Sequence, residues 1–238
     1  MGETDKPIVC YVTDRKALST PPGADSVSWL LEKLRLAVRA GADWVQIREK
    51  DLPGGTLLAL TREAVSIAQE ARKRSSERAV GIYLNDRLDV ALAAGMAGGA
   101  CAAGVHLGGE SLPLEDVVRW RRAGNAPPEF QIGVSCHSPE DARRAERGGA
   151  NYVFFGPIFD TPSKRAFGAP QGLERLREVC REIRIPVIAI GGIDETNGEE
   201  CIRAGASGVA AIRVFQEAAD AEALKEFISK VHGAREKI

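Results

Sequence analysis

Residues 40–45 read Ala-Gly-Ala-Asp-Trp-Val, and the pattern returns as Gly-Ala-Asn-Tyr-Val at 149–153 and Ala-Gly-Ala-Ser-Gly-Val at 204–209. Each copy is a glycine of the kind that ends a helix, followed by the start of an apolar strand. The glycines of the first two copies are 108 residues apart, or four units of 27, and those of the last two are 56 apart, or two units of 28. The copies therefore predict the second, sixth and eighth of eight evenly spaced units.

Eight short apolar runs fit that count, and helical patterns such as Leu31, Leu34 and Val38 lie between them. The runs are 8–12, 44–47, 81–84, 104–107, 131–134, 152–155, 187–190 and 208–211. This alternation predicts a parallel sheet of the α/β class. No G-x-G-x-x-G follows the first run, so the even spacing favours a single-domain (β/α)8 TIM barrel over a doubly wound open sheet. The predicted domain is 1–238, with 1–6 and 234–238 expected to fray.

Composition excludes several classes of protein. The 32 basic and 33 acidic side chains give a net charge of −1, so no global field attracts nucleic acid or a lipid surface. Five cysteines without a C-x-x-C pair, and no stretch typical of a signal peptide, predict reduced thiols in the cytoplasm. The uncharged stretch 90–109 has six glycines, too many for a membrane span. We expect small-molecule partners, and leave a homo-oligomer open.

Polar residues follow nearly every predicted strand. In a barrel of this kind the active site lies at the carboxyl ends of the strands, so these residues share one mouth. They are Gln46, Arg48, Glu49 and Lys50; Asn85 and Asp86; His106 and Glu110; Ser135, Cys136 and His137; Thr161, Ser163 and Lys164; Gly191 and Gly192; and Arg213.

Each group also has a structural interpretation. Residues 48–50 could form solvated ion pairs, and 85–86 could cap a helix at 88–94. The polarity of 161–164 is common in loops, each histidine could be packed or capping, and 191–192 could be a turn that needs glycine. Their joint occurrence favours a substrate with one phosphate, a second and more highly charged phosphoryl group, and a divalent cation.

The sequence resembles the thiamine phosphate synthase and thiazole tautomerase superfamily in six ordered motifs. These are Gln46-Ile-Arg-Glu-Lys50, Asn85-Asp-Arg87, Gly104-Val-His-Leu-Gly108, Gly133-Val-Ser135 with His137, Gly156-Pro-Ile-Phe with Thr161-Pro-Ser-Lys164, and Ile190-Gly-Gly-Ile193. The resemblance implies a transferase that joins hydroxymethylpyrimidine diphosphate to hydroxyethylthiazole phosphate. Diphosphate leaves first in that reaction, and the products are thiamine phosphate and diphosphate.

The resemblance also implies residue roles. It places Lys164, Ser135, Arg48 and His137 among the catalytic residues and makes Mg²⁺ the cofactor, with Asp86 as a ligand. The implied substrate-binding residues are Gln46, Arg48, Lys50, Asn85, Ser135 and Lys164 for the pyrimidine diphosphate, and Thr161, Ser163, Gly191, Gly192, Ile212 and Arg213 for the thiazole phosphate. His106 is a further substrate-binding residue, assigned to neither substrate in particular.

Two departures from the family pattern bear on these roles. The synthases usually present Gln-x-Asp after the fourth strand, where this chain has Gly109-Glu110-Ser111, so a second carboxylate ligand is missing. Glu110, or Ser111 with water, is expected to complete the magnesium site. Arg213 stands where serine is common, and its guanidinium either binds the phosphate or points outward.

Two alternative activities remain open at this point. A thiazole tautomerase of the same superfamily would rely on a histidine such as His137 and needs no metal. A non-catalytic binder of thiamine precursors would keep the phosphate contacts without turnover. The diphosphate-binding set favours the synthase, because Arg48, Lys50, Asn85, Asp86 and Lys164 are all retained. Segment 19–25 is a candidate lid, by position alone.

Overall fold

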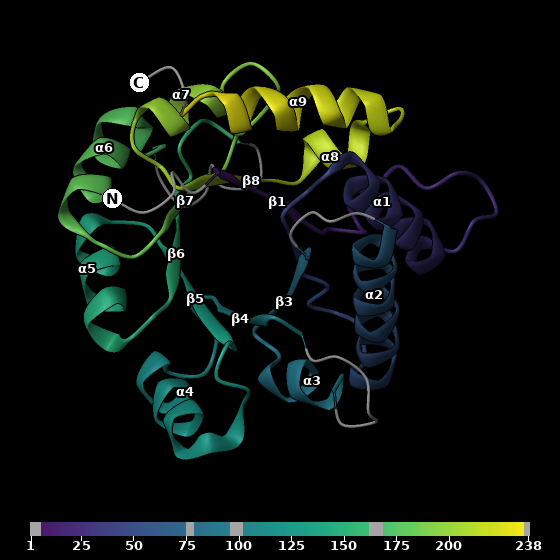
Figure 1. Ribbon diagram of the computed structural model, residues 1–238, viewed down its shortest axis with the longest axis horizontal. Helices are drawn as coiled ribbons and strands as arrows, with labels where there is room; N and C mark the ends of the chain where they lie inside the picture. Colours follow the sequence, from purple (N-terminus) through teal and green to yellow (C-terminus); the bar gives the residue numbers. More distant parts are fainter. Residues whose placement is uncertain (1–5, 75–78, 96–101, 162–168, 236–238) are drawn as a thin grey trace.

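Eight parallel strands close into a barrel in chain order, and helices surround it (Figure 1). The computed structural model describes residues 6–74, 79–95, 102–161 and 169–235. The first strand pairs with both the second and the eighth, which closes the sheet. The predicted TIM barrel is confirmed. The strands are β1 (Ile8–Val12), β2 (Trp44–Ile47), β3 (Gly81–Asn85), β4 (Gly104–Leu107), β5 (Gln131–Cys136), β6 (Tyr152–Phe155), β7 (Val187–Ile190) and β8 (Gly208–Ala211).

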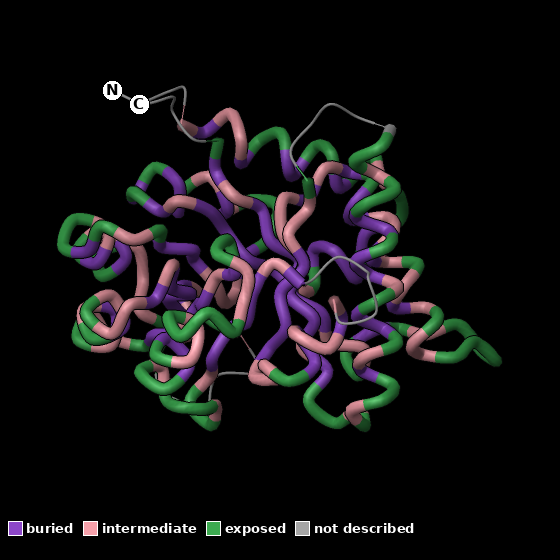
Figure 2. Tube along the Cα trace, turned by 60° about the horizontal axis from the view of Figure 1, so that its bottom comes forward, coloured by how far each residue is buried: buried purple, intermediate pink, exposed green. Residues whose placement is uncertain are grey.

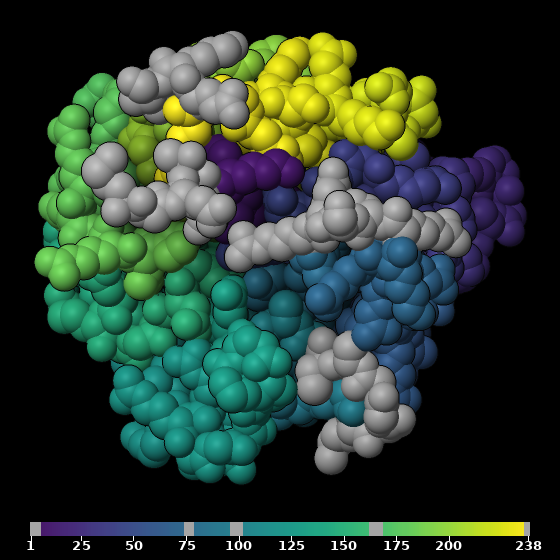
Figure 3. Space-filling view, in the orientation of Figure 1, coloured from purple at the N-terminus to yellow at the C-terminus, as the bar shows by residue number. Residues whose placement is uncertain are grey.

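The helices form a ring outside the strands. They are α1 (Ser26–Ala40), α2 (Gly54–Arg74), α3 (Leu88–Ala93), α4 (Leu114–Trp120) continued by η1 (Arg121–Asn125), α5 (Pro139–Gly148), α6 (Gly172–Glu182), α7 (Gly198–Arg203), α8 (Arg213–Glu217) and α9 (Ala221–Gly233). Figure 3 shows the yellow C-terminal helices against the dark blue α1, so the ring of helices closes as the sheet does.

The repeated glycines end helices as predicted. Gly41 and Gly149 follow α1 and α5 with φ of 96° and 94°, and Gly205 follows α7 with φ of 104°. In this left-handed region a side chain would clash with the following carbonyl, so glycine is the residue that lets the chain turn into β2, β6 and β8.

Alternate strand residues point into the barrel, and apolar side chains fill most of it. Figure 2 shows buried residues along the strands at the centre of the molecule. Near the strand starts, the Trp44 ring lies 4.7 Å from that of Tyr83 and 4.9 Å from that of Tyr152. The opposite side of each strand packs against the helices, with Val45 among the fully buried residues. Because the centre is a packed core, ligands can reach the barrel only at its ends.

Two strands end later than the sequence predicts, and the first is β3, which continues one residue beyond 81–84 to Asn85. Strand β5 runs two residues further than expected, which places Ser135 and Cys136 in the sheet. Residues 1–5 and 236–238 of the expected frayed ends lie outside the described residues. Within the described part of these ends, Lys6 Nζ lies 3.9 Å from Asp43, and Ala234 is fully buried.

Segment 19–25 extends outward beside α1, away from the barrel axis (Figure 1). In this conformation it does not cover the barrel end. Four cysteines, Cys10, Cys136, Cys180 and Cys201, are free thiols, and Cys101 lies outside the described residues. Within the described ranges, no helix combines the length and the apolar character that crossing a membrane requires.

Candidate functional site

Side chains at the ends of β2 and β3 form a continuous hydrogen-bonded chain. Gln46 Nε2 donates to Asn85 Oδ1 at 2.8 Å, and Asn85 Nδ2 donates to Asp86 Oδ2 at 2.5 Å. Lys50 Nζ lies 3.7 Å from the same Asp86 oxygen. Four residues implied by the resemblance to bind substrate or metal are therefore brought together at one barrel end.

Asp86 has a backbone that few residues adopt. Its φ of 63° is the only positive value among the described non-glycine residues. The left-handed conformation costs about 1–2 kcal/mol for most residues, and Asp and Asn tolerate it best. The carboxylate caps no helix, because Arg87 occupies the N-cap position of α3 and makes no side-chain cap bond. The helix-cap interpretation of Asp86 is therefore wrong, and its carboxylate faces the barrel end.

The loop after β4 meets that carboxylate. The Gly108 N–H donates to Asp86 Oδ1 at 3.0 Å, the Ser111 hydroxyl donates to the same oxygen, and Gly108 N–H also lies 2.6 Å from Ser111 Oγ. Glu110 is exposed on this loop. The structure thus places Ser111, rather than Glu110, against Asp86.

The oxygens of Asp86 and Ser111 can be compared with the ligands that a magnesium ion takes. Within the described ranges, no three His, Cys, Asp or Glu residues are grouped as a complete protein metal site would require. Mg²⁺ is commonly held by one or two carboxylates, with waters and substrate phosphates filling the other positions. One carboxylate on Asp86 and the Ser111 hydroxyl are hard oxygen donors of that kind. They fit an ion that is bound jointly with a phosphorylated substrate.

His106 points into the barrel and contacts Ser135, with Nε2 2.9 Å from Ser135 Oγ. Burial lowers the pKa of His106 from its ordinary 6.5 to about 3, opposed by the charge of Asp86, so the ring is neutral near pH 7. Its Nδ1 is buried and has no hydrogen-bond partner among the residues that the structure describes. A buried N–H without an acceptor is rarer and costlier than a buried lone pair, so we assign the proton to Nε2. His106 then donates to Ser135, whose own proton is available to a ligand.

His137 is exposed just beyond β5, and its Nδ1 lies 2.6 Å from the carbonyl oxygen of Gly156. A carbonyl only accepts, so Nδ1 carries the proton. In the neutral ring Nε2 is then an acceptor. This geometry suits a group that takes a proton from a ligand.

Gly191 and Gly192 turn the chain after β7, with φ of 96° and 69°. A Cβ on Gly192 would lie 2.8 Å from the Asp160 carbonyl oxygen, closer than real contacts allow. The turn therefore needs glycine for both its dihedrals and its packing, and its backbone reaches the segment after β6.

The remaining expected residues follow β6 and β8 in the sequence. Ile212 is half-buried after β8, and Arg213 is the exposed first residue of α8. Thr161 is the last described residue of the β6 loop. Ser163 and Lys164 lie outside the described residues.

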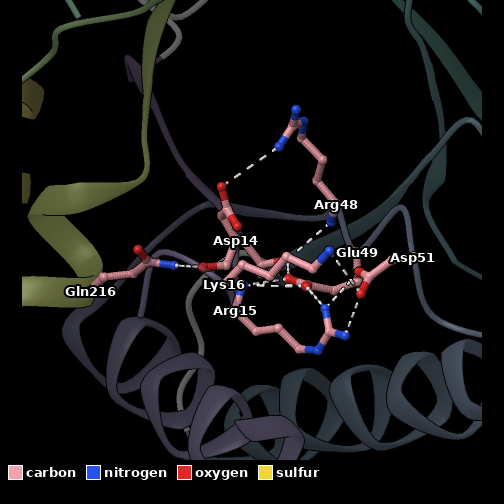
Figure 4. A network of polar contacts seen from close by, with 8 residues as sticks. Asp14, Arg15, Lys16, Arg48, Glu49, Asp51 and Gln216 are labelled. Atoms are coloured by element: carbon pink, nitrogen blue, oxygen red, sulfur yellow. Dashed lines mark hydrogen bonds and ion pairs between the residues drawn. The ribbon is translucent and has the colours of Figure 1, made fainter. Parts of the chain in front are cut away.

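The sequence interpretation missed the residues that follow β1. A pocket of about 420 Å³ is lined by Asp14, Lys16, Ala17, Arg48, Glu49, Lys50 and Asp51, so the ends of β1 and β2 share it (Figure 4). The rule that selected polar residues after the other strands would have found Asp14, Arg15 and Lys16, because only Thr13 separates them from the first apolar run.

Glu49 also differs from expectation. Glu49 is only 4% exposed, so the interpretation of residues 48–50 as solvated ion pairs is wrong for this position. Burial raises the pKa of Glu49, while hydrogen bonds from Thr13 and Arg15 and the Arg15 charge oppose the rise. The flanking Arg48 and Lys50 side chains remain 36% and 50% exposed. The pocket thus presents two accessible cations on either side of a buried carboxylate.

Comparison with known proteins places this geometry in a family. A family model described as thiamine monophosphate synthase matches residues 10–215. Thiamine-phosphate synthase of Roseiflexus sp. (strain RS-1) is 40% identical over 216 residues, which cover 91% of this chain and 81% of that protein. Thiamine-phosphate synthase of Roseiflexus castenholzii is 38% identical over 228 residues, which cover 96% of this chain and 89% of the relative.

A solved structure agrees with these sequence relatives. Thiamine phosphate pyrophosphorylase from Pyrococcus furiosus is 31% identical with a TM-score of 0.76, and the match covers 95% of this chain and 96% of that one. Sequence identity of this level over nearly the whole barrel indicates a shared family and not only a shared fold. The chain belongs to the thiamine monophosphate synthase family.

Proposed function

We propose that this chain couples hydroxymethylpyrimidine diphosphate with hydroxyethylthiazole phosphate to give thiamine phosphate and diphosphate. The observation that best supports this proposal is the chain of hydrogen bonds from Gln46 through Asn85 and Asp86 to Ser111, with Lys50 beside Asp86. It gathers cationic, amide, carboxylate and hydroxyl groups at one barrel end. Family membership and the synthase names of the relatives support the same activity.

The reaction breaks the bond between the pyrimidine methylene carbon and the diphosphate oxygen, which keeps the electron pair. The thiazole nitrogen then donates its lone pair to that carbon and forms the new C–N bond. Charge therefore accumulates on the leaving diphosphate, where fixed cations act most strongly. Arg48 and Lys50 supply those cations in this proposal, with Lys164 from the β6 loop as the third.

Polar groups at the same end would orient the pyrimidine half. The Oε1 atom of Gln46 is a buried acceptor without a hydrogen-bond partner among the described residues, and suits an amino group. Asn85 fixes the other end of that amide. The Ser135 hydroxyl, oriented by His106, would donate to the diphosphate. Holding both reactants in line is itself a large part of such catalysis.

Mg²⁺, when bound, would neutralise charge on the diphosphate. Asp86 and Ser111 would hold it, with Glu110 near enough in sequence to contribute from the same loop. The thiazole phosphate would bind on the other side of the barrel end, at Thr161 and Ser163 and at the backbone of Gly191, Gly192, Ile212 and Arg213. We further propose that the enzyme works in the cytoplasm.

One observation favours tautomerase activity as a second candidate. The contact of His137 Nδ1 with the Gly156 carbonyl oxygen leaves Nε2 as the ring nitrogen that could accept a proton from a thiazole ring. Replacing His137 with Ala should abolish aromatisation of the thiazole tautomer and leave coupling of the aromatic thiazole largely intact. Equal loss of both activities would assign His137 a structural role.

The test is turnover by the purified protein with both phosphorylated precursors, with and without Mg²⁺, and with thiamine phosphate measured by chromatography. Product that depends on Mg²⁺ supports the synthase. Aromatisation of the thiazole tautomer without coupling would support the tautomerase instead. Tight binding of thiamine phosphate without either reaction would make the chain a non-catalytic binder.

A further inference from the structure

The buried carboxylate of Glu49 joins two segments that are far apart in the sequence (Figure 4). Its Oε1 accepts from Thr13 Oγ1 at 2.6 Å and from the Arg15 N–H at 3.1 Å. Its Oε2 accepts from the Arg15 N–H at 3.2 Å and from Arg15 Nη1 at 3.2 Å. The donors come from the end of β1 and the carboxylate from the end of β2. A buried carboxylate with every oxygen satisfied fixes these two strand ends relative to one another.

Thr13 extends this connection to Arg48. The backbone N–H of Arg48 donates to Thr13 Oγ1 at 2.9 Å, and the Thr13 hydroxyl donates in turn to Glu49. Because the hydroxyl proton is committed to Glu49, the oxygen lone pairs face the Arg48 N–H. The backbone from which the Arg48 side chain extends is therefore held by the Glu49 carboxylate through one intervening hydroxyl.

Arg15 extends the connection to Asp51. Its guanidinium donates two hydrogen bonds of 2.7 Å to the Asp51 carboxylate while Nη1 also reaches Glu49. Lys16 lies 3.1 Å from Asp51 as well. Hydrogen bonding from Arg15 lowers the pKa of Asp51 well below its usual range. Glu49 and Asp51, two of the carboxylates that line the pocket, are thus paired with Arg15 and Lys16.

Arg48 and Lys50 have looser partners. Arg48 Nη1 lies 3.9 Å from Asp14, and Lys50 Nζ lies 3.7 Å from Asp86. Both side chains line the pocket, and Figure 4 shows Arg48 extending away from the Glu49 cluster. Tight pairing of Glu49 and Asp51 with other cations leaves these two able to meet an anionic ligand.

We propose that Glu49 is a positioning residue for the diphosphate half of the substrate, acting through Thr13 and Arg15 to present Arg48 and Lys50 to that ligand. This inference rests on the proposed function. A buried ion pair contributes little net stability, because desolvation offsets the attraction between the charges. The cluster is explained instead by what it holds in place: a pre-organised pair of cations loses less entropy when a diphosphate binds.

The test compares Thr13→Val, which removes the hydroxyl at nearly constant shape, with Thr13→Ser, which restores it. Glu49→Gln removes the charge, and Glu63→Gln is the matched control, because Glu63 forms an exposed ion pair with Arg35 at 2.5 Å. Calorimetry measures binding of inorganic diphosphate in the presence of Mg²⁺, and steady-state kinetics measures KM for each substrate. Circular dichroism confirms that each variant is folded.

Thr13→Val and Glu49→Gln should each weaken diphosphate binding about tenfold and raise KM for the pyrimidine diphosphate to match. KM for the thiazole phosphate should not change, because its proposed site lies on the other side of the barrel end. Thr13→Ser and Glu63→Gln should bind diphosphate as the wild type does. If Glu49→Gln does not fold, the Thr13 pair still decides the question.

Wild-type diphosphate affinity in a folded Thr13→Val variant would overturn the proposal. So would an equal rise in KM for both substrates, or no diphosphate binding by the wild type. Failure of the proposed function is a separate result. If the wild type binds diphosphate but forms no thiamine phosphate, the proposed function is refuted. The binding comparison would then still test the role of Glu49.

Discussion

The hydroxyl of Ser111 donates a hydrogen bond to Oδ1 of Asp86, which joins the loop after β4 to the end of β3. Ser111 stands where the family resemblance leads us to expect an aspartate. The pair therefore offers one negative charge, not two, to a bound cation. Affinity for a hard divalent ion rises with the number of charged oxygen ligands.

Replacing Ser111 with Asp should lower the Mg²⁺ concentration needed for half-maximal coupling, by about tenfold. Without metal, the added carboxylate would lie beside Asp86 and destabilise the fold through like-charge repulsion. Mg²⁺ should therefore raise the melting temperature of the variant more than that of the wild type. Calorimetric titration of Mg²⁺ measures the affinity directly. Unchanged affinity would mean that Glu110 already supplies the second carboxylate.

Asp86→Asn should reduce turnover by about two orders of magnitude while leaving stability within about 1 kcal/mol of the wild type. Asparagine tolerates the left-handed φ of 63° as aspartate does, so the backbone is not newly strained. The lost charge faces Lys50 and the proposed metal. Denaturant unfolding and coupling kinetics on one preparation separate the two effects. Full activity in the folded variant would refute the assigned role of Asp86.

Gly192→Ala should cost about 1–3 kcal/mol of folding stability, because the new Cβ meets the Asp160 carbonyl at a positive φ. It should also raise KM for the thiazole phosphate more than KM for the pyrimidine diphosphate. Gly233→Ala is the control, since its Cβ meets nothing within 4 Å and Gly233 lies in α9. A change in the pyrimidine KM alone would place the thiazole phosphate elsewhere.

His106 should make the protein less stable in mild acid. Its pKa is about 3 in the folded chain and about 6.5 when unfolded, so below pH 6.5 only the unfolded chain gains this proton. This contribution is fully present above pH 6.5 and falls as the pH drops toward 3, with about 2 kcal/mol lost by pH 5.

The check is urea unfolding of the wild type and His106→Gln at pH 7.5 and pH 5. The stability of the wild type should fall more over this interval, because glutamine does not titrate. The other histidines and the carboxylates are the same in both proteins. An equal loss of stability in both would show that His106 is not the group responsible.

Most of the barrel could be predicted from the sequence, because its signals are local. A glycine such as Gly41 ends a helix wherever it occurs, and an apolar run such as 44–47 is buried in any parallel sheet. Strand ends were less certain: Ser135 is polar, yet β5 continues through it because β6 supplies a pairing partner in Phe154. Pairing depends on distant residues, which local composition does not reveal.

The sequence predicted most of the residues of the site but not the contacts between them. Asn85 and Asp86 were candidates by position, but only the fold shows that Ser111 reaches Asp86 and that Asp86 caps no helix. The sequence gives Glu49 the appearance of a solvated charge. Its burial depends on Arg15, 34 residues earlier in the chain, so no local pattern could predict it.

Phosphorus NMR of an equimolar mixture of the two precursors with Mg²⁺ and catalytic amounts of the purified protein tests the central claim most directly. The account predicts that the organic diphosphate signals disappear while inorganic diphosphate and thiamine phosphate appear in equal amounts. In a control in which buffer replaces the thiazole phosphate, neither product should form over the same time. Unchanged spectra from a folded protein that binds both precursors would contradict it.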